Sequence, residues 1–70
     1  MNTTHTSRFT VTGMTCAHCV ASVSEEVGEI EHVTDVAVDL TSGALTVTSE
    51  APIAEADVEE AVVAAGYQLA

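Results

Sequence analysis

Both cysteines of this chain lie in the stretch from Gly13 to Cys19, which reads Gly-Met-Thr-Cys-Ala-His-Cys. Alternating polar and apolar residues precede this stretch, and apolar residues at helical spacing follow it, so we expect the cysteines where a loop becomes a helix. The first amides of a helix lack partners and carry the positive end of its dipole, which favours the thiolate form of a cysteine. The position therefore predicts exposed, reactive thiolates able to bind a soft metal.

Cys16 and Cys19 are three positions apart, a spacing that lets both thiolates converge on one ion. Two sulfur ligands suit copper(I), whereas a structural zinc site takes four ligands and this chain has only two cysteines. Two further residues of the stretch carry donor atoms. His18 is either a direct ligand or an exposed position of the loop, and we favour the second reading. Met14 is either a thioether ligand or a core residue beneath the loop, and we again favour the second.

A helix is predicted from about Cys16 to Ile30, because four apolar residues spaced three, four and three apart form one stripe. They are Val20, Val23, Val27 and Ile30. Thr15 is placed to cap this helix, its hydroxyl accepting a backbone N–H of the first turn. The glutamates of this segment lie off the stripe, and we interpret them as a solvated face, not as a second metal site.

The remaining elements follow from alternation and turn residues. We predict strands at Ser7–Thr12, Val33–Leu40, Ala44–Ser49 and Tyr67–Leu69 and a second helix at Ala54–Ala65. This order predicts an α+β fold, a ferredoxin-like βαββαβ sandwich with two helices on one face of a four-stranded antiparallel sheet. Residues 7–70 are assigned to one domain, and residues 1–6 to a flexible N-terminal tail.

The charge of the chain is strongly negative. Eleven acidic residues face one Arg and no Lys, giving a formal charge of −10, which argues against unaided binding to nucleic acid or anionic lipid. A protein or cation partner fits this charge better. The alternative interpretation is that the charge only keeps a small protein soluble. The first residues show no signal peptide and no window is apolar enough to span a bilayer, so we predict a cytoplasmic protein. In a reducing compartment the two cysteines indicate a metal or redox pair.

The stretch Gly-Met-Thr-Cys-Ala-His-Cys resembles the metal-binding loop of heavy-metal-associated domains, and most of all that of the small bacterial copper(I) chaperones. The run from Asp57 to Tyr67 is similar to the second helix of that family and its closing Gly-Tyr. The resemblance implies that Cys16 and Cys19 hold copper(I) and pass it by thiolate exchange to a copper-transporting P-type ATPase. It also implies a monomer without metal, with a metal-bridged homodimer open as an alternative.

The same resemblance suggests roles for residues around the thiols. Met14 would point inward, Thr15 would support the loop, and His18 would modulate the acidity of the thiols without ligating. Tyr67 would lie beside the metal loop and limit access to it, the alternative being an ordinary core aromatic. His32 stands where the family commonly has Gly, so we expect a left-handed backbone or an altered turn there.

Two other functions remain open alongside a chaperone. A dithiol oxidoreductase also places Cys-x-x-Cys at a helix start, but thioredoxin-like folds need a longer chain than this. A detached metal-sensing domain of a copper ATPase would carry the same loop, although the start at Met1 and the end at the last strand favour a free-standing protein. No catalytic triad, phosphate-binding loop or paired catalytic carboxylates stand out, and we do not predict an enzyme.

Overall fold

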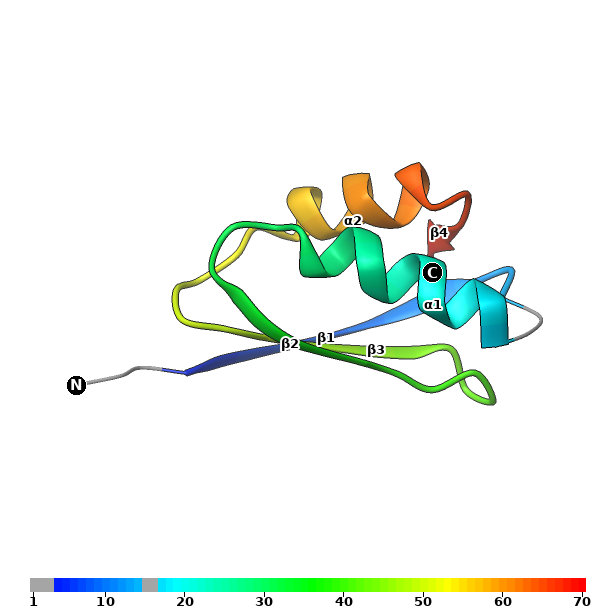
Figure 1. Cartoon of the computed structure of the whole chain (residues 1–70), viewed down its shortest axis with the longest axis horizontal. Coiled ribbons are helices and arrows are strands. Elements are labelled where there is room, and N and C mark those ends of the chain that lie inside the picture. Colours follow the sequence, from blue (N-terminus) through cyan, green and yellow to red (C-terminus); the bar gives the residue numbers. More distant parts are fainter. Residues whose placement is uncertain (1–3, 15–16) are drawn as a thin grey trace.

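Helices and strands follow one another in the order β1 (His5–Thr12), α1 (Ala17–Gly28), β2 (Val33–Val38), β3 (Ala44–Ser49), α2 (Glu55–Ala64) and β4 (Gln68–Leu69). The computed structural model describes residues 4–14 and 17–70. The strands form a four-stranded antiparallel sheet in the order β2-β3-β1-β4, and both helices lie on the same face of it (Figure 1). The predicted ferredoxin-like βαββαβ sandwich is confirmed. None of the helices within the described ranges is long and apolar enough to cross a membrane.

Strand β1 is central in the sheet and leads directly into the cysteine loop. It pairs with β3 from His5 opposite Ser49 through Thr10 opposite Ala44, and with β4 at Val11 and Thr12. The strand begins earlier than predicted, so the assignment of residues 5 and 6 to a flexible tail is wrong. Their backbones extend the β-ladder along β3. Hydrophobic alternation could not predict this, because both residues are polar.

The core between the sheet and the helices is built from small aliphatic side chains. Five valines and one leucine are completely buried, namely Val23, Val27, Leu45, Val47, Val58 and Val62. Each such side chain contributes about 1.5–3 kcal/mol of hydrophobic stabilisation relative to an exposed position. The predicted stripe of α1 is confirmed at its centre, with Val20 half-buried and Ile30 packed at the edge of the core. This packing fixes α1, and with it the helix start that follows the cysteine loop.

The turn between β2 and β3 differs from the prediction. Strand β2 ends at Val38, and Leu40, expected on the inner face, is 39% exposed. The chain turns instead, because the Asp39 side chain accepts the Thr41 N–H at 2.9 Å and the Asp39 carbonyl accepts the Gly43 N–H at 2.8 Å. An Asp that bonds the backbone two residues ahead initiates a turn, and this local bond overrides the alternating pattern.

Both helices end earlier than predicted, and α2 also begins one residue later. α1 ends at Gly28, and a turn follows in which Ile30 N–H donates to the Val27 carbonyl at 3.1 Å. His32 then has a φ of +74°, the left-handed conformation that was one of the two alternatives expected there. α2 begins after Ala54, which makes no side-chain capping bond, as the absence of a capping residue type predicts.

Candidate metal-binding loop

The cysteine loop connects the end of β1 to the start of α1. Gly13 has a φ of +92°, a left-handed backbone that redirects the chain away from the sheet after Thr12. Met14 is half-buried and packs against the hydrophobic core, which agrees with its interpretation as a core residue beneath the loop. The predicted helix cap, Thr15, and the predicted ligand Cys16 lie outside the described residues.

Cys19 lies in the first turn of α1, which begins at Ala17. Cys19 is only 8% exposed, so the prediction of an exposed thiol is wrong at this position. The reason is the helical repeat, because Cys19 precedes Val23 by four residues and Val27 by eight and therefore shares their buried stripe. The first turn still places Cys19 at the positive end of the helix dipole, where an anionic sulfur is favoured.

His18 faces a different direction from its neighbour. Successive residues of an α-helix are rotated by about 100° around its axis, and His18 is exposed where Cys19 is buried. Its backbone carbonyl accepts the Ser22 hydroxyl at 3.2 Å, a bond within α1 that does not engage the imidazole. This orientation agrees with the reading of His18 as an exposed loop-edge residue, and a role in tuning thiol acidity stays a prediction.

Tyr67 lies near the C-terminal end of the sequence, but its side chain packs beside Gly13 at the start of the loop. A Cβ added to Gly13 would lie 3.4 Å from the Tyr67 Cδ1, so the ring packs closely over the Gly13 backbone. The Tyr67 N–H donates to the Val62 carbonyl at 3.0 Å, and the preceding Gly66 has a φ of +97°, which together turn the chain from α2 back toward the loop. Tyr67 is therefore both a residue packed on the core and a neighbour of the loop.

No second metal site accompanies the loop in the described part of the chain. Residues 4–14 and 17–70 contain no group of three or more His, Cys, Asp and Glu side chains placed to hold a metal ion. The other two histidines, His5 at the start of β1 and His32 after α1, lie outside the cysteine loop.

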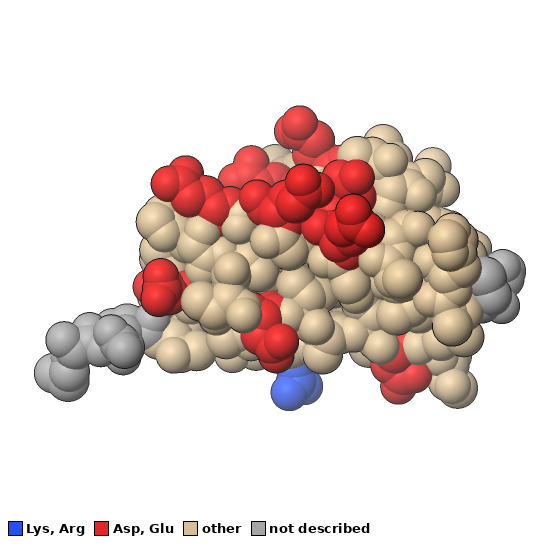
Figure 2. Space-filling model, in the orientation of Figure 1, with Lys and Arg blue, Asp and Glu red and all other residues tan. Residues whose placement is uncertain are grey.

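The electrostatic character of the surface is uneven. Carboxylates gather over the helices, while the single basic residue, Arg8, projects from β1 in the sheet (Figure 2). Sequence reasoning correctly treats the glutamates of α1 as exposed, but it misses that carboxylates of α2 stand opposite them. Only the packing of α1 against α2 brings these two sets together.

Comparison with known proteins extends the similarity well beyond the cysteine loop. Residues 8–68 match the family described as the heavy-metal-associated domain. A COP-associated protein of Helicobacter felis is 44% identical over 59 residues, which are 84% of this chain and 89% of that protein. The copper chaperone CopZ of Bacillus subtilis is 38% identical over 61 residues, which are 86% of this chain and 88% of the CopZ chain.

A solved structure shows the same arrangement in three dimensions. It is the N-terminal domain of a potential copper-translocating P-type ATPase from Bacillus subtilis in the Cu(I)-loaded state. The two folds agree with a TM-score of 0.85 at 31% identity, over 96% of this chain and 85% of that one. The resemblance of fold therefore covers all the elements that position the cysteine loop.

Proposed function

This chain belongs to the heavy-metal-associated domain family, and on that basis we propose that it is a cytoplasmic copper(I) chaperone. The observation that carries the proposal is the Cys-x-x-Cys motif at the β1–α1 junction, with Cys19 fixed by the core in the first helical turn. Similarity to two proteins named copper chaperone CopZ, along more than four-fifths of the chain, supports the choice of metal. Members of this family bind metal without catalysing a reaction, and we assign this chain no catalytic role.

Two thiolates, those of Cys16 and Cys19, are the proposed ligands. Thiolate is a soft donor that selects copper(I), and two such donors satisfy the ion while leaving it accessible to a third. Met14 packs into the core and His18 points outward, so neither is proposed as a ligand. The helix dipole at the first turn of α1 favours the anionic sulfur that binding requires.

Release of the ion is proposed to occur by ligand exchange. A thiolate of a recipient protein adds to the bound copper(I), forming one Cu–S bond, and the Cu–S bond to one cysteine of this chain then breaks. The departing sulfur leaves as a thiolate, and the copper keeps its oxidation state throughout. Such a sequence never frees the ion, because a new bond forms before an old one is lost.

The proposed recipient is the metal-binding domain of a copper-transporting P-type ATPase. The fold shared with the N-terminal domain of such an ATPase supports this choice, since two similar loops can approach and exchange thiolates without rearranging either domain. The same likeness favours one alternative, that this chain acts as a metal-sensing domain of an ATPase. A monomer without metal is proposed, with a homodimer bridged by shared copper as a second state at high metal load.

The test is an anaerobic titration of the reduced protein with copper(I) against a chromophoric chelator, with zinc(II) titrated in parallel. We expect one copper(I) per chain, bound tightly enough to compete with the chelator, and much weaker zinc binding. A variant with Cys16→Ser and Cys19→Ser should lose this binding, whereas His18→Asn should keep the stoichiometry. A chain that fails to compete for copper(I) but cycles between dithiol and disulfide would be a redox protein, and the proposal would be withdrawn.

A further inference from the structure

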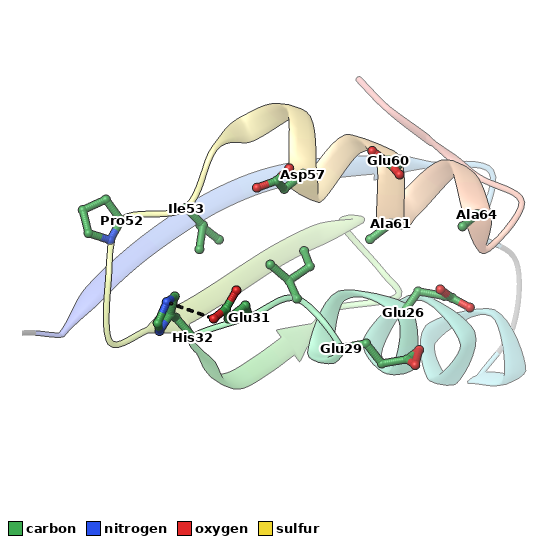
Figure 3. Close-up of a pocket in the computed structure, with 11 residues that line it drawn as sticks. Glu26, Glu29, Glu31, His32, Pro52, Ile53, Asp57, Glu60, Ala61 and Ala64 are labelled. Atoms are coloured by element: carbon green, nitrogen blue, oxygen red, sulfur yellow. Dashed lines mark ion pairs between the residues drawn. The ribbon is translucent and has the colours of Figure 1, made fainter.

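A groove lies between α1 and α2, outside the cysteine loop (Figure 3). Its volume is about 450 Å³. One side is formed by Glu26 of α1 and by residues 29–32 after that helix, and the other side by Pro52 and Ile53 before α2 and by α2 itself. We propose that this groove is a docking surface for a basic, extended peptide segment of a partner protein. The groove is separate from the proposed metal ligands, and the inference requires no metal.

The rim of the groove is acidic on both sides. Glu26 projects from α1 and Glu29 follows the last residue of that helix, and Asp57 and Glu60 project from α2 (Figure 3). Glu31 completes the rim beyond the end of α1, and its side chain is 88% exposed. Carboxylates from two helices therefore face the same hollow, which concentrates negative potential between them.

The chain itself has little with which to neutralise this rim. It contains no Lys and one Arg, Arg8, which lies on β1 in the sheet. Within the described residues the one ion pair recorded joins His32 Nε2 to Glu31 Oε1 at 3.7 Å, and it exists only while the imidazole is protonated. The C-terminal end of α1 adds the negative end of the helix dipole to the same region. A cationic partner is thus the complement that the groove lacks.

The floor of the groove is apolar, which is a second and independent property. Ile30, Ile53 and Ala61 line it, and the first two pack against the edge of the hydrophobic core. Lysine and arginine side chains combine a long aliphatic stem with a charged end, so their stems can cover such a floor while their ends reach the carboxylates. A small hydrated cation would use the rim but not the floor.

The charge of the groove favours a cationic peptide over other occupants. No group of three or more ligating side chains within residues 4–14 and 17–70 is close enough to hold a metal ion, so the groove is not a cation site. A second copy of this chain, also at −10, would be repelled. In an extended peptide, side chains on one face repeat every second residue, at about 6.6–6.8 Å, so several cationic side chains can face the acidic rim at once.

The position of the groove has a functional consequence. α1 contains 12 residues and is therefore about 18 Å long, with the cysteine loop at its N-terminal end and the groove at its C-terminal end. An occupant seated near His32 and Pro52 leaves the loop accessible. The groove thus allows a partner to hold the protein while its thiols remain available.

The experiment is an NMR titration of the isotopically labelled, metal-free protein with a synthetic peptide of alternating lysine and alanine, at low ionic strength. The groove variant combines Glu29→Gln, Asp57→Asn and Glu60→Gln. The matched variant combines Glu25→Gln, Asp35→Asn and Glu59→Gln, all exposed residues that do not line the groove. Each variant removes three negative charges, taking the formal charge from −10 to −7.

We expect the peptide to shift amide resonances along the groove of the unaltered protein. Exposed ion pairs are individually weak, so removing three together should lower the affinity about tenfold in the groove variant and less than about twofold in the matched variant. Equal losses in both variants would mean that net charge alone attracts the peptide, and would overturn the proposal. Shifts centred on the cysteine loop, or no binding at all, would overturn it too.

A copper(I) titration of the groove variant separates this inference from the proposed function. Unchanged copper binding together with lost peptide binding is the expected pair of results. Should the unaltered protein fail to bind copper(I) yet still bind the peptide in the groove, the docking surface would stand and the chaperone function would fall. Binding of calcium in preference to the peptide would identify a cation site and refute the docking proposal.

Discussion

Replacing Gly43 by Ala should sharply destabilise the domain, and Gly28→Ala is its matched control. Gly43 has a φ of +76°, and a Cβ built there would lie 2.5 Å from the Val11 carbonyl oxygen. The neighbouring backbone cannot simply yield, because the Val11 N–H donates to the Gly43 carbonyl at 2.8 Å. Gly28 has no such φ, and a Cβ added there would meet nothing within 4 Å.

The magnitude follows from two separate costs. A left-handed backbone costs a residue with a Cβ roughly 1–2 kcal/mol. Moving the Val11 carbonyl far enough to admit the methyl group strains or breaks a hydrogen bond worth about 1 kcal/mol. We therefore expect Gly43→Ala to lower the free energy of unfolding by about 2–3 kcal/mol. A domain of 70 residues has roughly 3.5–10 kcal/mol in total, so this is a large fraction of its stability.

Urea denaturation followed by circular dichroism measures both variants. Gly28→Ala should raise the free energy of unfolding by about 0.5–1 kcal/mol, because alanine restricts the unfolded chain and favours the helix. The two substitutions are chemically identical, so opposite signs would show that local backbone geometry decides the outcome. Equal effects, or a loss below about 1 kcal/mol for Gly43→Ala, would refute the reasoning.

Three further predictions concern residues near the two ends of α1. His32→Gly should raise the free energy of unfolding by about 0.5–1 kcal/mol in thermal or urea unfolding, because it relieves a φ of +74°, and a destabilised variant would contradict the strain. In metal-free protein, Cys19→Leu should lower the free energy of unfolding by about 1–3 kcal/mol in urea denaturation, because a larger side chain enters a position that is only 8% exposed; an unchanged stability would argue against burial. Tyr67→Leu should speed the removal of copper(I) by an added chelator several-fold in stopped-flow absorbance, whereas Tyr67→Phe should not, if the ring over Gly13 limits access to the loop. Unchanged rates in both Tyr67 variants would leave that residue a packing role alone.

Periodicity predicted the fold because each element buries one face. Strand β3 was predicted at its observed bounds, Ala44–Ser49, since Leu45 and Val47 alternate with polar residues and are both fully buried. The end of β2 was not predicted correctly. The turn that begins at Asp39 depends on a hydrogen bond to its side chain, and hydrophobic alternation carries no information about that bond. The start of β1 was missed for a related reason, since His5 and Thr6 join the sheet through backbone pairing alone.

The candidate site was predicted by residue type, but its geometry required the tertiary structure. The spacing of Cys19 from Val23 and Val27 already indicated a buried position, yet the chemistry of a thiol favoured an exposed one. The contact of Tyr67 with Gly13 joins residues 54 positions apart, and only the return of the chain after α2 creates it. The groove likewise exists only because α1 and α2 pack side by side.

The burial of Cys19 shows how a small domain can position a reactive side chain without a separate scaffold. Cys19 is buried on the same stripe of α1 as Val23 and Val27, so the position of the thiol depends on how α1 lies against the sheet. As a proposed ligand, a side chain held in this way would lose little further conformational freedom on binding an ion, which would lower the entropic cost of binding. The same packing also ties the site to the fold, because any substitution that shifts α1 against the sheet moves Cys19 with it. We therefore expect core substitutions such as Val23→Ala to lower the affinity for copper(I) even where the domain remains folded.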